Sequence, residues 1–120
     1  INKSFNPNEN SILKPDSRNR RESFTVTADT VPNIVRELGF GHIDFLKIEA
    51  EGVEPEILEG AVEDSMEIRK IAVDASPERD EQPTVDKIRS ILESHGYESC
   101  TKESERWWGK YIVFARTKRT

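Results

Sequence analysis

Two carboxylates and a glycine follow a mostly apolar run of residues, and this cluster holds the densest chemistry in the sequence. The run spans residues 43–48 and is followed by Glu49, Glu51 and Gly52. In open α/β sheets, ligands bind outside the carboxyl ends of strands, where a carboxylate can orient or accept a ligand's proton. Gly52 permits a sharp backbone turn, and Lys47 can pair with a carboxylate. From the pattern alone, helix capping and solvation remain the commoner explanation for acidic residues before a helix.

The spacing of apolar residues predicts the elements that position this cluster. Residues 43–48 do not alternate cleanly, which predicts a strand covered on both faces, as in a parallel sheet. Pro55 opens a helix after it, because a missing N–H costs nothing in the first turn. The other predicted elements are a strand at 24–28, a helix that begins at Asp29 or Thr30 and stops at Gly39, a strand at 71–73, a helix over 85–92 ended by Gly96, and strands at 97–101 and 110–116.

The order of these elements predicts an α/β fold. Strands that alternate with helices indicate a mostly parallel sheet with helices on its faces. A short polar loop joins the last two predicted strands, which favours a C-terminal antiparallel pair because parallel strands need a longer crossover. Residues 1–22 are rich in polar residues, so we expect a flexible N-terminal arm there.

Composition excludes several classes of protein. The formal net charge of the 120 residues is -5, which opposes nonspecific binding to nucleic acid or to an anionic membrane surface. No apolar run approaches the ~20 residues needed to span a bilayer. Cys100 is the only cysteine, so no intrachain disulfide forms and a reducing, cytoplasmic location is the simplest interpretation. His42 and His95 do not stand in a metal-binding spacing, and we predict no metal site.

The acidic cluster resembles the signature of the FkbM family of methyltransferases, in which a strand reading roughly D-x-x-K-x-D-x-E-G-x-E is followed by a helix. The residues that match as they stand are Asp44, Lys47, Glu51, Gly52 and Glu54. Glu49 stands where the family usually has Asp. Weaker similarity to the family's following helix, next strand and last helix-to-strand turn extends over about residues 24 to 116.

The resemblance implies transfer of a methyl group from S-adenosylmethionine, most simply to a hydroxyl oxygen of a small molecule or a glycan. It implies a catalytic role for Glu49 and Glu51, with Lys47 as their electrostatic partner. It also implies that Glu49 and Gly52 contact the cofactor. Residues 23–118 would then form the C-terminal half of a partial Rossmann-like methyltransferase sheet.

The family's other half carries a glycine-rich turn after its first strand, and no G-x-G-x-x-G pattern occurs here. We therefore expect the isolated chain to bind S-adenosylmethionine weakly or not at all and to be inactive alone, whereas a complete parent protein would be an enzyme. The alternative is a non-catalytic or degenerate α/β interaction module. In either case one edge of the 43–48 strand would be unpaired, which predicts self-association, or coverage of that edge by residues 24–28 or by the N-terminal arm.

Overall fold

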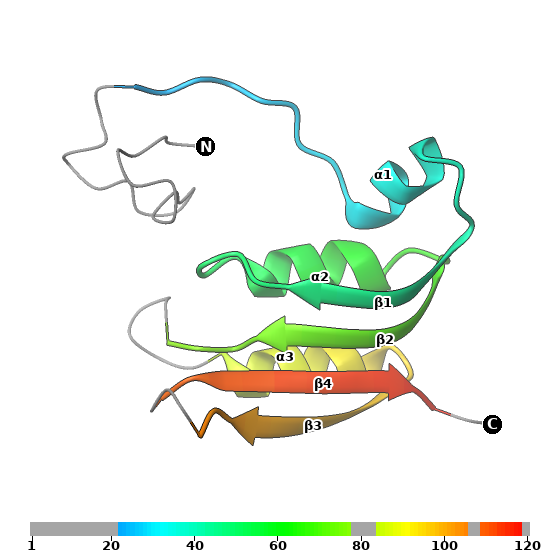
Figure 1. The fold of residues 1–120 in the computed structure, drawn as a ribbon. Coiled ribbons are helices and arrows are strands. Elements are labelled where there is room, and N and C mark those ends of the chain that lie inside the picture. The colour runs from blue at the N-terminus through cyan, green and yellow to red at the C-terminus, as the bar shows by residue number, and fades with distance from the viewer. Residues whose placement is uncertain (1–21, 78–83, 106–108, 119–120) are drawn as a thin grey trace.

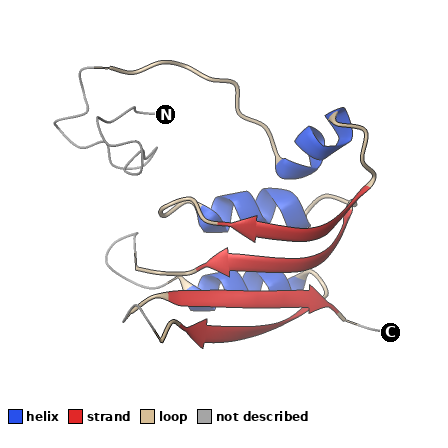
Figure 2. Ribbon diagram, in the orientation of Figure 1, coloured by secondary structure: helices blue, strands red, loops and turns tan. Residues whose placement is uncertain are grey.

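The computed structural model describes residues 22–77, 84–105 and 109–118. The predicted N-terminal arm, apart from Glu22, lies outside the described residues. The chain forms a sheet with helices packed on it (Figures 1 and 2). In chain order the elements are α1 (Val31–Glu37), β1 (His42–Ile48), α2 (Glu54–Val62), β2 (Glu67–Asp74), α3 (Val85–Ser94), β3 (Tyr97–Glu103) and β4 (Tyr111–Thr117). No helix within these residues is long and apolar enough to cross a membrane.

The sheet has four strands in the order β1-β2-β4-β3. β1 and β2 are parallel, whereas β4 is antiparallel to both of its neighbours, β2 and β3. The α/β class and the C-terminal antiparallel pair are confirmed. The expectation of a mostly parallel sheet is wrong, because β4 returns from β3 through a short connection and then also pairs with β2. One strand therefore adds two antiparallel ladders and leaves a single parallel one.

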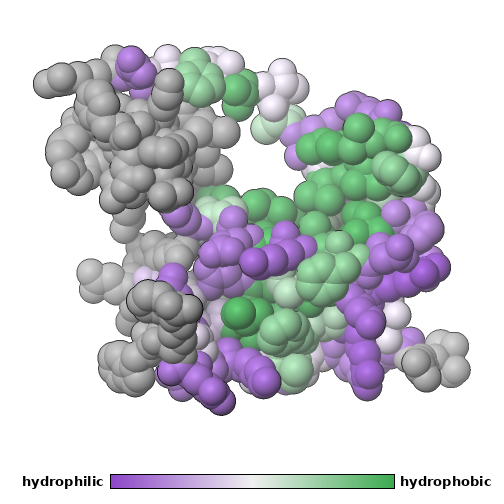
Figure 3. Space-filling view, viewed as in Figure 1, coloured by the Kyte–Doolittle hydropathy of each residue, from purple (hydrophilic) through white to green (hydrophobic). Residues whose placement is uncertain are grey.

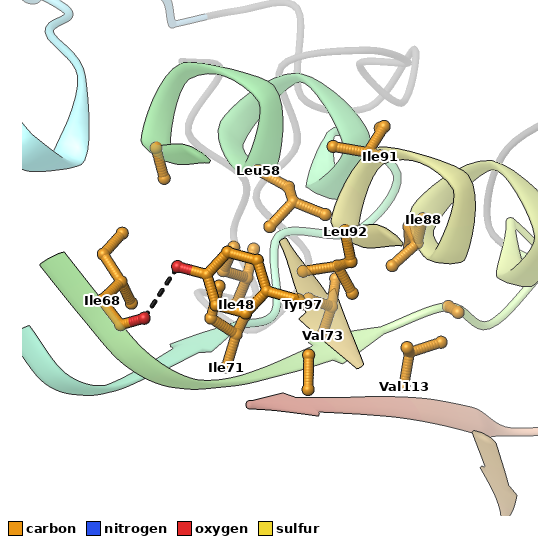
Figure 4. Packing of buried hydrophobic residues seen from close by; sticks show 13 residues of the cluster. Ile48, Leu58, Ile68, Ile71, Val73, Ile88, Ile91, Leu92, Tyr97 and Val113 are labelled. Atoms are coloured by element: carbon orange, nitrogen blue, oxygen red, sulfur yellow. Dashed lines mark hydrogen bonds between the residues drawn. The ribbon is translucent and has the colours of Figure 1, made fainter. Parts of the chain in front are cut away.

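The hydrophobic core lies between the sheet and the helices α2 and α3. Its largest fully buried side chains include Leu58 of α2, Ile88 and Leu92 of α3, and Ile71 and Val73 of β2. Figure 4 shows these side chains between the strands and the two helices. Each fully buried aliphatic side chain contributes about 1.5–3 kcal/mol relative to an exposed one. This layer therefore fixes the position of both parallel strands.

The opposite face of the sheet is open within the described residues. Phe45 of β1 is 55% exposed and Phe114 of β4 is 38% exposed. Figure 3 shows an apolar patch over the strands, bordered by hydrophilic residues. The expectation that residues 43–48 are covered on both faces is wrong here, because α2 and α3 both pack on the same face. The open face supplies the surface on which the candidate site lies.

In the segment before β1, the predicted helix is confirmed and the predicted strand is wrong. Residues 24–28 form an irregular, exposed segment, because no neighbouring strand of the sheet pairs with them. The edge of β1 is therefore not covered by this segment. α1 begins as predicted: the Asn33 N–H donates to Thr30 Oγ1 over 3.3 Å, and Pro32 lies in the first turn. It ends at Glu37, shortly before Gly39, whose φ of 90° is the left-handed conformation that commonly follows a helix.

Tyr97 ties the start of β3 to β2 from within the core. Its hydroxyl donates a hydrogen bond of 2.7 Å to the carbonyl oxygen of Ile68, which Figure 4 marks with a dashed line. Burial, with a smaller contribution from the Glu67 carboxylate, raises the pKa of the Tyr97 phenol. The proton therefore stays on the hydroxyl, where it satisfies a buried carbonyl.

We predict that Tyr97→Phe lowers the free energy of unfolding by about 1–2 kcal/mol, because the Ile68 carbonyl loses its buried donor. Urea unfolding followed by circular dichroism measures this difference. Tyr111→Phe removes a hydroxyl from a partly buried ring of β4 and serves as the matched control. Equal stability of Tyr97→Phe and the unmodified chain would show that this hydrogen bond does not contribute.

Candidate functional site

The carboxyl ends of β1 and β2 meet at one edge of the sheet because the two strands are parallel. Lys47 is paired with Ala72, and Ile48 with Val73, in the register of the two strands. The residues that follow, Glu49 after β1 and those after Asp74 of β2, therefore leave the sheet side by side. A predicted site at this edge thus receives side chains from two strands rather than one.

A concave region of about 600 Å³ lies on the open face at this edge. Its floor is apolar and its rim is polar. The residues that line it are Phe45, Lys47, Ile48, Glu49, Ala72, Asp74, Ser76, Ser104, Lys110, Ile112 and Phe114. An apolar hollow with a few convergent polar groups is the usual form of a small-molecule site.

The sheet register explains the apolar floor. Ala72 pairs with Lys47 on one side and with Phe114 on the other, so a small side chain lies between two larger ones. Phe45 and Phe114 rise beside it from β1 and β4, and both remain partly exposed. Aromatic rings that flank a small residue provide flat apolar surface for a ligand's carbon skeleton.

Lys47 and Glu49 form an ion pair at the rim. Lys47 Nζ lies 3.4 Å from Glu49 Oε2, and both side chains are more than half exposed. The structure therefore brings together two of the residues predicted for the site. An exposed pair of this kind contributes at most about 1 kcal/mol to stability. Its geometry leaves the Glu49 carboxylate accessible to a ligand while a cation stays beside it.

The turn after Glu49 has an unusual backbone. Glu51 has a φ of 52° and Gly52 a φ of 114°, so two consecutive residues adopt positive values. Glu51 is exposed and belongs to this turn, but it does not line the concave region. Gly52 is buried, and its N–H donates to the Glu54 carboxylate at 2.9 Å. Gly52 therefore shapes the turn, and its amide is already used within the chain.

Glu54 lies inside the protein rather than on the surface. It is only 2% exposed, and its Oε2 accepts the N–H of Ala50 at 2.5 Å in addition to its bond with Gly52. The sequence places Glu54 near the start of α2, where a negative charge is favourable, and this much was expected. We did not expect its carboxylate to bind the preceding loop.

A second carboxylate, that of Asp74, stabilises the loop after β2, and no role was predicted for it from the sequence. Asp74 Oδ1 accepts hydrogen bonds from the Ser76 hydroxyl at 2.5 Å and from the Ser76 N–H at 3.0 Å. The Ser76 Oγ in turn accepts the N–H of Tyr111 at 3.3 Å. The signal in the sequence was an Asp and a Ser two residues apart, directly after a buried strand, which is typical of a local side-chain turn.

The described residues contain no group of three His, Cys, Asp or Glu side chains placed to hold a metal ion. His42 lies 3.1 Å from Asp44 at the opposite end of β1 from Glu49. The ring of His95 contacts the Ile91 carbonyl near the end of α3. At the edge of the sheet, the carboxylates of Glu54 and Asp74 accept hydrogen bonds from backbone amides and a hydroxyl, and Glu49 pairs with Lys47.

Most of the chain matches the model of a known protein family. The family model described as the methyltransferase FkbM domain matches residues 2–99. Because the match covers well over half of the chain, the protein belongs to the FkbM methyltransferase family, and the resemblance stated above is confirmed. No curated protein and no solved structure matches the chain.

We predict that Gly52→Ala destabilises the protein by about 1–2 kcal/mol, because a side chain at positive φ meets the carbonyl of its own backbone. Gly41→Ala is the matched control, since a Cβ at Gly41 meets no atom within 4 Å and its φ is not positive. Urea unfolding of both variants provides the measurement. Equal loss of stability in the two variants would contradict the assigned role of Gly52.

Proposed function

We propose that this chain provides the acceptor side of an S-adenosylmethionine-dependent methyltransferase that acts on a hydroxyl oxygen. Membership of the FkbM family supports methyl transfer as the reaction class. The observation that carries the proposal for this site is the position of Glu49. Its carboxylate stands at the carboxyl end of β1, paired with Lys47, on the rim of the concave region.

The residues at this edge fit one part of the cofactor. The accessible carboxylate of Glu49 suits the hydroxyl or ammonium groups of S-adenosylmethionine, which donate hydrogen bonds or carry positive charge. The N–H of Gly52 is bound to Glu54, so it does not donate to the cofactor. Gly52 instead shapes the turn that follows Glu49. The 120 residues contain no G-x-G-x-x-G turn through which backbone could approach a cofactor closely. We therefore propose that other polypeptide supplies the remaining contacts.

In this proposal the chain positions the acceptor and handles one proton. Bound S-adenosylmethionine supplies a methyl group activated by a positively charged sulfur. The chain holds the acceptor so that its hydroxyl oxygen faces that methyl group, and correct alignment supplies much of the acceleration in such reactions. Glu49 accepts or orients the hydroxyl proton as the new carbon–oxygen bond forms. Lys47 pairs with Glu49 at the rim of the concave region, and Glu51 adds negative charge nearby.

The proposal predicts that Glu49→Gln lowers methyl transfer by about 100-fold, the lower limit of a typical contribution from general base catalysis. The assay uses the natural polypeptide that contains these residues, tritiated S-adenosylmethionine, and a panel of sugar and small-molecule hydroxyl acceptors. Glu51→Gln should have a smaller effect, because Glu51 does not line the concave region. Glu63→Gln is the matched control, since Glu63 is exposed at the far end of α2. Unchanged transfer by Glu49→Gln would remove this residue from the site.

We also propose a second candidate function, that of an interaction module, and one observation supports it. Within the described residues β1 pairs only with β2, so its other edge has unpaired backbone groups. Exposed apolar side chains lie near it, including Phe45 on β1 and Leu38 and Phe40 just before β1. A free edge beside apolar surface is a template for pairing with another chain.

We predict that the isolated 120-residue chain self-associates through this edge. Light scattering should give a mass above the 13.8 kDa of one chain, and the mass should rise with concentration. In the associated state the β1 amides should exchange slowly with solvent, because they are paired on both sides. A mass of one chain at every concentration, together with rapid exchange of the outward-facing β1 amides, would contradict this prediction.

A further inference from the structure

Glu54 occupies a position that helix capping alone does not explain. A carboxylate at the start of a helix is stabilised by the helix dipole while it remains in water. Glu54 instead is 2% exposed, and a buried carboxylate requires hydrogen-bond donors that replace its lost water. Those donors are the N–H groups of Ala50 and Gly52, at 2.5 Å and 2.9 Å from its two oxygens. The side chain therefore turns toward the preceding residues and binds the loop between β1 and α2.

The two amides that Glu54 binds flank the strained residue of that loop. Glu51 lies between them with a φ of 52°, a value that few residues other than glycine adopt. Such a conformation persists only where the surrounding structure determines it, and it occurs most often at functional sites. A single carboxylate that holds the amides on both sides of Glu51 closes the loop around this residue.

The Ala50 amide also fixes the residue before it. The peptide group that donates this N–H is the one that joins Glu49 to Ala50, so the position of Glu54 sets the orientation of that peptide plane. The plane sets the ψ angle of Glu49, and the rotamers that the Glu49 side chain can adopt depend on the φ and ψ angles of that residue. Glu49 is the carboxylate that pairs with Lys47 and lines the concave region.

From these contacts we infer that Glu54 is a positioning residue, which holds the Glu49–Gly52 loop so that Glu49 faces the acceptor. This inference rests on the proposed role of Glu49 in methyl transfer. Glu54 itself does not touch substrate, because its carboxylate is buried and both of its oxygens are bound to backbone. A simple charge effect at the start of α2 is the competing explanation, and Glu56 in the same helical turn provides a test of it.

The test compares Glu54→Gln, Glu54→Ala and Glu56→Gln in the natural polypeptide. Gln keeps the shape of Glu but offers one acceptor oxygen, and Ala offers none. Amide hydrogen exchange, measured by NMR, should therefore become faster at Ala50 and Gly52 in the order unmodified, Gln, Ala. One lost hydrogen bond to a charged group corresponds to about a ten-fold increase in exchange. Glu56→Gln removes a charge from the same turn and should leave both amides unchanged.

Kinetics then separate positioning from stability. In the tritium transfer assay, kcat should fall by about ten-fold in Glu54→Gln, because the Glu49 carboxylate is misdirected, whereas Glu56→Gln should leave kcat unchanged. The Gln and Ala variants should rank in the same order in kcat as in amide exchange. If Glu54→Ala does not fold, the comparison of Gln with the unmodified protein still decides the question.

Two results would overturn the inference, and they differ from a failure of the proposed function. Unchanged exchange at Ala50 and Gly52 in Glu54→Gln would show that the carboxylate does not hold the loop. Faster exchange with unchanged kcat would show that Glu54 has a structural role only. A failure of the proposed function would be seen separately, as unchanged transfer by Glu49→Gln, and the exchange measurement does not depend on it.

Discussion

The parallel pairing of β1 with β2 is the constraint on which the candidate site depends. Because the two strands run in the same direction and in register, the chain leaves both of them at one edge of the sheet. The packing of α2 and α3 on a single face fixes this pairing through a continuous aliphatic core. The same one-sided packing leaves the other face open, and the concave region forms where the open face meets the shared edge. Displacement of either strand would separate Glu49 from Asp74.

The two loops at this edge are stabilised by the same kind of interaction. Glu54 binds backbone amides of the loop after β1, and Asp74 binds the amide and hydroxyl of Ser76 after β2. Carboxylates that accept backbone N–H groups form stronger hydrogen bonds than neutral acceptors do. Both loops are thereby held by local contacts, while the exposed carboxylate of Glu49 stays available. Preorganisation of this type is what a site for group transfer requires, because alignment of the reactants is its main contribution.

Local patterns in the sequence predicted the local structure well. Thr30 and Pro32 mark the start of α1, Gly39 marks its end, and Gly96 follows α3 with a φ of 86°. These features depend on a few neighbouring residues, so the sequence contains the whole signal. The strand predicted at 24–28 failed because a strand requires a partner, and the composition of one segment does not say whether a partner is present.

The longer-range features were predicted less well, for a related reason. β4 lies between β2 and β3 because the edge of β2 was available for pairing. The spacing of apolar residues in the sequence does not predict which strand edge is available. The exposure of Phe45 likewise depends on which face the helices cover. At the site, we expected that Lys47 could pair with a carboxylate, and the structure places it beside Glu49. The inward turn of Glu54 was missed, since a glutamate at the start of a helix has the same pattern whether it faces solvent or the preceding loop.

We propose above all that the ligand site lies where the loops after β1 and β2 leave the sheet. NMR shift mapping tests this directly, with S-adenosylhomocysteine added at up to millimolar concentration so that even weak binding is visible. We expect the largest shifts on the amides of Glu49, Ala50 and Ser76, and little change in the amides of α1. Shifts confined to α1 or to the outer strand β3, with the amides of Glu49 and Ser76 unchanged, would contradict it.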